Sequence, residues 1–205
     1  KTIFTEISSQ YGFLSILFLA FINKFGFSLS SLPILIWCLF IVQYFLCFYL
    51  VVKQSKSFVF AFICLCAILT INFIAMRVIP TDYPQAGPLR WLLLLFSLFL
   101  SQRLKNFTSL KLIFLVALAG FWMIDSGIEL ILAYLFTIFL IFLTRRLSLK
   151  KLTNSFFFLL LSILLIFLLI QVSHLLLGYK LISFLAIFTK IRQYANAGFG
   201  LLPIE

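Results

Sequence analysis

The sequence predicts an all-α, polytopic transmembrane helical bundle with about seven hydrophobic segments, some of them short or broken. Hydrophobic residues make up 64% of the 205-residue chain, and the mean hydropathy is +1.24. Soluble domains are only about 45–50% apolar, so a globule of this size would lack the polar surface to cover its core. Apolar runs such as residues 159–170 are continuous rather than alternating in polarity. This pattern favours helices over the strands of a membrane barrel.

The apolar runs have different lengths, and a bilayer of about 30 Å needs about 20 helical residues. Three runs are long enough to cross it, and two others are short. A 34-residue run at 110–143 would form a helix of about 50 Å at 1.5 Å per residue, so the polar residues Asp125, Ser126 and Gly127 are expected to divide it in two. The long runs are residues 32–52, 57–76 and 155–177, and the short ones are residues 11–22 and 91–100.

Polar or proline-rich segments separate these runs. Residues 53–56 form a tight polar turn, and residues 145–151 are a strongly basic loop. Residues 77–90 read RVIPTDYPQAGPLR, and their prolines favour an ordered loop over a helix. We expect one transmembrane domain over residues 1–205. A chain that starts with Lys1 rather than Met is also consistent with a fragment of a longer protein.

The charge balance, 16 Lys and Arg against 5 Asp and Glu, fits a membrane protein better than a nucleic-acid-binding one. The chain has no long polar segment that could present a basic face to nucleic acid. If the N-terminus is cytoplasmic and the spans alternate, the loops 53–56, 101–111 and 144–154 share its side, which the positive-inside rule makes cytoplasmic. With Lys1, that side then collects ten basic residues and only Glu6 as an acid: Lys1, Lys53, Lys56, Arg103, Lys105, Lys111, Arg145, Arg146, Lys150 and Lys151.

No metal or cofactor is expected. The four cysteines lie in apolar runs without a CxxC spacing, and His174 has no nearby Cys, Asp or Glu in the sequence, so neither set is typical of a metal site. A hydrogen bond at a helix interface is the expected role of His174. Walker, GxSxG, HExxH and dinucleotide-binding motifs do not occur, which argues against direct use of a nucleotide.

Two acids and several basic residues fall on the predicted outer side and are the candidates for chemistry. Asp125 and Glu129 are four residues apart, so they share a face of a continuing helix. Ionisable residues within apolar segments usually face a cavity or a partner. The acidic pair is therefore a candidate for contacting a sugar hydroxyl or a cation. The alternative is an outer loop in which acids are tolerated because they are hydrated.

The arginines of the proline-rich loop are candidates for binding phosphate. Arg77 and Arg90 flank Asp82 in an apolar outer region, and guanidinium groups bind phosphate in a bidentate manner. Alternatively, these residues anchor the loop at the interface or pair with the acids of residues 125–129. Lys190 and Arg192 lie on the same predicted side and complete the candidate binding set.

The string DYPQAGPLR at residues 82–90, followed by an apolar run and GFWMIDSG at residues 120–127, resembles the middle of C-type superfamily membrane glycosyltransferases. The resemblance covers about residues 77–135, under a third of the chain. It implies inverting transfer of a sugar from a polyprenyl-phosphate carrier at the outer face of a bacterial inner membrane, with an acidic general base. By position, Arg77 and Arg90 would bind the carrier phosphate. Asp125 and Glu129 would contact the sugar and supply the acidic residue that acts as general base.

The chain departs from that family at its first predicted outer loop, residues 23–31. This loop contains no Asp or Glu, although the family's catalytic acid normally lies there. A non-catalytic accessory subunit of a larger membrane complex is therefore the main alternative function. A transporter or flippase fragment is a third, supported only by the predicted break at residues 125–127. Membrane lipids, a polyprenyl-phosphate sugar and other membrane subunits are the expected partners.

Overall fold

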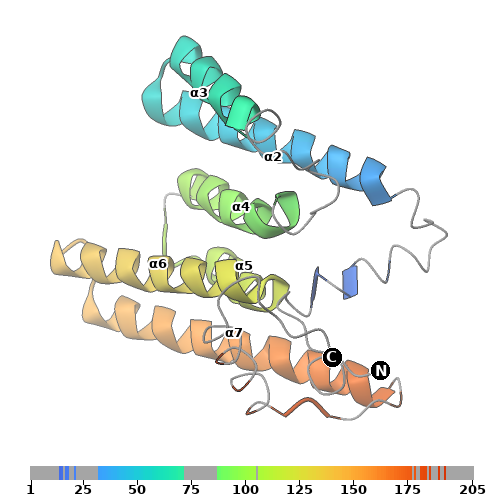
Figure 1. Cartoon of the computed structure of the whole chain (residues 1–205). Helices are drawn as coiled ribbons and strands as arrows, with labels where there is room; N and C mark the ends of the chain where they lie inside the picture. Colours follow the sequence, from blue (N-terminus) through green and yellow to red (C-terminus); the bar gives the residue numbers. More distant parts are fainter. Residues whose placement is uncertain are drawn as a thin grey trace.

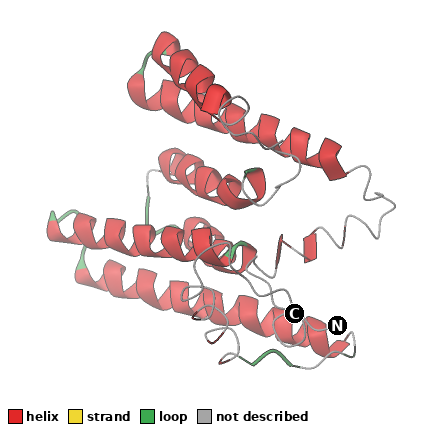
Figure 2. Ribbon diagram, in the orientation of Figure 1, coloured by secondary structure: helices red, strands yellow, loops and turns green. Residues whose placement is uncertain are grey.

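A computed structural model describes residues 14, 15, 17, 18, 21, 32–71, 87–104, 106–176, 178, 181–183, 185, 189 and 192. All regular secondary structure in these residues is helical, as Figure 2 shows. The prediction of an all-α fold is confirmed, but the predicted count of seven hydrophobic segments is not confirmed. Most of the predicted run at residues 11–22 lies outside the described residues. The helices of the described part of the chain are α2 (Leu32–Ser55), α3 (Phe58–Thr70), α4 (Pro88–Leu104), α5 (Leu110–Trp122), α6 (Ile124–Leu143) and α7 (Leu149–Leu176).

Three of these helices are long and apolar enough to cross a membrane, which indicates an integral membrane protein. The candidate spans are Pro33–Ser55, Ile124–Leu143 and Leu149–Leu176. The apolar helix α5 has only 13 residues, or about 20 Å. It packs against α4, α6 and α7, so neighbouring helices of the same chain enclose much of its surface.

The turns between α2 and α3, between α4 and α5, and between α6 and α7 lie together at one end of the bundle (Figure 1). These are the three connections that the sequence predicts on one side of the membrane, and the fold groups them in the same way. Basic residues occupy or flank each turn, including Lys56, Arg103 and Arg145. The starts of α4 and α6 and the end of α7 lie at the opposite end.

The long apolar run at 110–143 is divided in two, but not at the predicted residues. Met123 is extended, with φ −139° and ψ 119°, and it separates α5 from α6. The Met123 amide still donates to the Ala119 carbonyl, and the Met123 carbonyl accepts from the amide of Gly127. The two helices therefore meet at a single residue, and the sequence Asp125-Ser126-Gly127 forms the first turn of α6.

Two other helix starts come earlier than predicted. Helix α4 begins at Pro88, so Arg90 is helical rather than part of the loop. Proline suits a first helical position because the amide hydrogen that it lacks would have no intrahelical partner there. Helix α7 begins at Leu149, which places Lys150 and Lys151 in its first turn. The Ser148 hydroxyl caps this turn by accepting from the Lys151 amide at 3.4 Å.

Two apolar clusters hold the helices together. The larger cluster joins α5, α6 and α7, and Ile113, Val116 and Ala117 at its centre are almost fully buried. The smaller cluster joins α2 to α4 and also contacts α3 and Trp122. Its buried members are Ile36, Phe40, Tyr44 and Leu89.

Candidate functional site

The candidate site lies where α4 and α6 begin, at the end of the bundle away from the basic turns (Figure 1). The backbone of α4 is fixed there by two contacts from the α5–α6 junction. The indole Nε1 of Trp122 donates to the Leu89 carbonyl at 2.6 Å, and the Ser126 hydroxyl donates to the Arg90 carbonyl at 3.3 Å. The first turn of α4 is therefore attached to the break between α5 and α6.

Close backbone packing supports both helix starts. A Cβ on Gly127 would lie 2.1 Å from the Ala119 carbonyl oxygen, so only glycine fits between α6 and α5 at this point. A Cβ on Gly87 would lie 2.3 Å from Cζ of Phe40, where α4 begins against α2. These two glycines therefore set how closely the helices approach around the site.

An ion pair joins the two helix starts. Nη2 of Arg90 lies 2.7 Å from Oδ2 of Asp125, and the two side chains are 29% and 21% exposed. Oδ1 of Asp125 accepts from the Ser126 amide at 2.6 Å. Both carboxylate oxygens of Asp125 are thus engaged, and its charge also suits the positive end of α6. Asp125 is better placed to orient Arg90 than to take a proton from a substrate.

The Arg90 guanidinium retains donors beyond this ion pair. Its Nε is buried and has no hydrogen-bond partner among the residues that the structure describes. A guanidinium has five N–H groups, and a carboxylate on one edge leaves others for a second anion. A phosphate oxygen is a chemically suitable partner because arginine binds it through two parallel hydrogen bonds.

Glu129 lies one turn further along α6 and is exposed. It has no ion pair or hydrogen bond to any described residue. Its neighbours Ile128 and Leu132 are 41% and 60% exposed, so this carboxylate lies on an outward apolar face. The position is about 8 Å from the start of α6 at 1.5 Å per residue. A carboxylate at such a place is available to accept a proton or to meet a cation.

The predicted site residues have different outcomes. Arg90 and Asp125 are brought together, as the alternative reading of an arginine–acid pair expected. Asp125 and Glu129 share one helix, α6. Arg192 is described only as an exposed helical residue. Three predicted binding residues, Arg77, Asp82 and Lys190, lie outside the described residues.

Sequence reasoning missed the roles of Trp122, Ser126 and Gly127 in this site. The string Trp-Met-Ile-Asp-Ser-Gly at 122–127 was visible as a polar interruption, but no periodicity shows that an indole and a hydroxyl will bond to the backbone of α4. Elsewhere in the described residues, no group of three or more His, Cys, Asp or Glu side chains could hold a metal ion. His174 is buried in the last turn of α7.

Comparison with known proteins adds no relative. No protein-family model matches the chain, and neither a curated protein nor a solved structure is significantly similar to it.

Proposed function

We propose that this chain binds a lipid-linked sugar phosphate where α4 and α6 begin, and that it acts there as a polyprenyl-phosphate-dependent glycosyltransferase of the membrane. The observation that carries the proposal is the ion pair between Arg90 and Asp125. It holds a guanidinium with spare donors beside a helix start, next to the apolar faces that a lipid carrier would follow. The carrier phosphate is the ligand that this arrangement suits best.

In this proposal the roles of the two acids differ. Asp125 orients Arg90, which binds the carrier phosphate. Glu129 removes the proton from the acceptor hydroxyl as its oxygen attacks the anomeric carbon of the sugar. The bond between that carbon and the phosphate oxygen breaks, and polyprenyl phosphate leaves as the anion that Arg90 stabilises. Arg77, Asp82, Lys190 and Arg192 remain proposed contributors to substrate binding.

The proposal also gives the chain an orientation. The end that carries the basic turns faces the cytoplasm, together with the N-terminus, and the Arg90 end faces outward in a bacterial inner membrane. The supporting argument is the positive-inside rule, applied to turns that share one end of the fold. A carrier-linked sugar would then be used at the outer face.

A binding experiment tests the proposal first. The purified chain in nanodiscs is titrated with a polyprenyl phosphate and with the polyprenol of the same length. We expect tighter binding of the phosphate, and loss of this preference in Arg90→Gln. Arg103→Gln is the matched control, because Arg103 is on the same helix at the opposite end. Equal binding of phosphate and alcohol by the unaltered chain would contradict the proposal.

The catalytic step is tested separately with a panel of polyprenyl-phosphate sugars, each supplied together with hydroxyl-bearing acceptors, because the sugar must be transferred to an acceptor oxygen. Release of polyprenyl phosphate is measured for the unaltered chain and for Glu129→Gln. We expect Glu129→Gln to abolish release while it leaves carrier binding unchanged, because the residue contacts the acceptor rather than the phosphate. If the chain binds the carrier but releases polyprenyl phosphate from none of these sugars, it is a carrier-binding protein and not a transferase.

A second candidate function is an accessory subunit of a membrane complex. Helix α3 packs mainly against α2, and one part of its surface is strongly apolar and exposed, with Val59 at 68% and Ile63 at 59%. A partner helix could cover this face. If it does, Val59→Lys or Ile63→Lys should remove a stoichiometric partner from the purified material, and intact mass measurement of that material would show it.

A further inference from the structure

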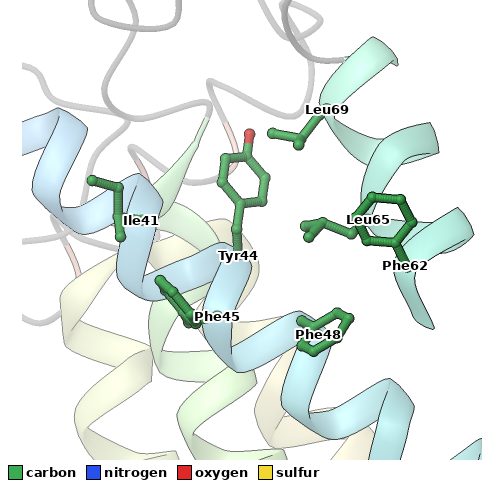
Figure 3. Close-up of a pocket in the computed structure, with 7 residues that line it drawn as sticks. All are labelled: Ile41, Tyr44, Phe45, Phe48, Phe62, Leu65 and Leu69. Atoms are coloured by element: carbon green, nitrogen blue, oxygen red, sulfur yellow. The ribbon is translucent and has the colours of Figure 1, made fainter. Parts of the chain in front are cut away.

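An apolar groove runs between α2 and α3, on a part of the fold that the proposed transferase site does not use (Figure 3). Its volume is about 300 Å³, and its lining is almost entirely apolar. Figure 3 shows side chains from the two helices facing one another across it, with the Tyr44 hydroxyl beside Leu69. The lining residues are Ile41, Tyr44, Phe45, Phe48, Phe62, Leu65 and Leu69.

The only charges of the α2–α3 hairpin lie at one end of this groove. Residues 32–71 contain two charged side chains, Lys53 and Lys56, and no acid. Both lysines are exposed at the turn between the helices. The ammonium group of Lys53 lies 5.6 Å from the centroid of the Tyr49 ring, a cation–π contact that holds it against the last turns of α2.

Lys56 ends α2 in a backbone conformation that is uncommon for a residue with a side chain. Lys56 has φ 55°, a left-handed conformation that glycine adopts at lower cost after a helix. Its amide donates to the Val52 carbonyl at 2.8 Å and closes the end of α2. A basic side chain thus occupies a position where backbone conformation alone would favour glycine.

The spacing between the lysines and the groove matches the structure of one membrane leaflet. Along α2, Phe48 is about 8 Å from Lys53, and Ile41 is about 18 Å from it, at 1.5 Å per residue. The polar interface of a leaflet is about 5–8 Å thick, and the hydrocarbon of that leaflet continues for about 15 Å beyond it. With Lys53 at the headgroup level, the groove lies at the depth of the acyl chains.

We propose that the α2–α3 hairpin is a binding site for an anionic phospholipid, whose phosphate contacts Lys53 and Lys56 and whose acyl chain lies in the groove. The paired lysines complement the charge of the headgroup, and the groove offers the chain an apolar lining instead of other lipid tails. The turn that carries the two lysines lies at the opposite end of the bundle from Arg90. This inference does not depend on the chain being a glycosyltransferase.

Photo-crosslinking tests the proposal on the full chain. The protein is reconstituted in phosphatidylcholine bilayers that contain a small fraction of phosphatidylglycerol with a diazirine in its acyl chain, and adducts are located by mass spectrometry after irradiation. We expect adducts within residues 41–48 and 62–69. A phosphatidylcholine carrying the same diazirine chain should label these residues on the order of tenfold less.

Variants at the two ends of the site separate headgroup recognition from the groove. Lys53→Gln combined with Lys56→Gln should lower phosphatidylglycerol labelling to the level of phosphatidylcholine. Lys150→Gln combined with Lys151→Gln is the matched control, because these lysines lie at another turn of the same end, and it should leave labelling unchanged. Phe62→Trp, at an exposed side chain of the lining, should reduce groove adducts by filling space.

Three results would overturn the proposal. The two headgroups could label the groove equally, the lysine variants at positions 53 and 56 could label as strongly as the unaltered chain, or the adducts could fall on other helices.

Discussion

Arg90 and Asp125, which are 35 residues apart in the chain, connect the starts of α4 and α6, with 2.7 Å between Nη2 and Oδ2. The pair is partly buried, so its partners have lost much of their hydration and depend on one another. The Asp125 carboxylate also accepts from the Ser126 amide. The Asp125 carboxylate therefore forms the ion pair between α4 and α6 and also accepts a hydrogen bond in the first turn of α6.

Breaking this pair should destabilise the fold measurably. Arg90→Met or Asp125→Asn alone leaves one charge without its partner and should lower the free energy of unfolding by about 1–3 kcal/mol. The double variant should lose less than the sum of the two, because no uncompensated charge remains. Unfolding in mixed detergent micelles measures these values. Arg103→Met, at the exposed end of α4, is the control and should change stability by under about 0.5 kcal/mol. Strictly additive losses in the Arg90 and Asp125 double variant would contradict a coupled pair.

Gly127 should tolerate no side chain. A Cβ at this position would lie 2.1 Å from the carbonyl oxygen of Ala119, which belongs to the backbone of α5 and cannot rotate away. We expect Gly127→Ala to lower stability by about 2–4 kcal/mol, read from the thermal unfolding of the purified chain. Gly120→Ala is the control, because its Cβ would meet only the flexible end of Ile131 at 2.9 Å. Equal effects of the two substitutions would show that α5 and α6 separate easily.

The helical class and the position of the turns followed from the sequence because both depend on composition along the chain. The position of the break between α5 and α6 does not depend on composition alone. The run at 110–143 is too long for one span, so two helices were predicted. The break was predicted at residues 125–127 because they interrupt the apolar run, but it lies at Met123. A methionine carries no turn signal, and the extended conformation of this residue depends on packing between α5 and α6.

The candidate site was predicted only in part for a similar reason. Charge counting placed Arg90 and Asp125 on one side of the membrane, which made their pairing one of the alternatives. The bonds from Trp122 to Leu89 and from Ser126 to Arg90 span 33 and 36 residues. Such contacts depend on how three helices pack, and no local pattern in a single sequence records that packing.

Gln171 should hold the segment that follows α7. Its side-chain carbonyl accepts from the Ile182 amide at 2.9 Å, and its side-chain amide donates to the Ile182 carbonyl. Gln171→Leu removes both bonds, so hydrogen exchange at Ile182 should become faster by about tenfold, as expected from the loss of about 1.4 kcal/mol of local protection. Gln171→Glu keeps the acceptor and should have a smaller effect. Unchanged exchange in Gln171→Leu would mean that packing alone holds the segment.

Arg145 offers a stabilising substitution. It follows the last turn of α6 with φ 56°, and its amide donates to the Phe142 carbonyl at 2.9 Å. Glycine adopts this left-handed conformation without the steric cost of a Cβ, so Arg145→Gly should raise the free energy of unfolding by about 0.5–1 kcal/mol. Arg146→Gly, whose φ is not positive, is the control and should not stabilise. A loss of stability in Arg145→Gly would show that the charge at this turn contributes more than the backbone strain removes.

The orientation of the bundle can be decided by cysteine accessibility. In a background where the four native cysteines are replaced by serine or alanine, single cysteines are introduced at Lys56, Thr108 and Ser148 in the three turns of one end, and at Gly178 beyond the end of α7. A membrane-impermeant maleimide should label the first three only in inside-out vesicles and the fourth only in right-side-out vesicles, because basic turns are retained on the cytoplasmic side.

The opposite labelling would reverse the proposed orientation and place Arg90, Asp125 and Glu129 on the cytoplasmic side, which excludes use of a carrier-linked sugar at the outer face. Labelling of the three turns from different sides would instead contradict the shared end that the fold gives them.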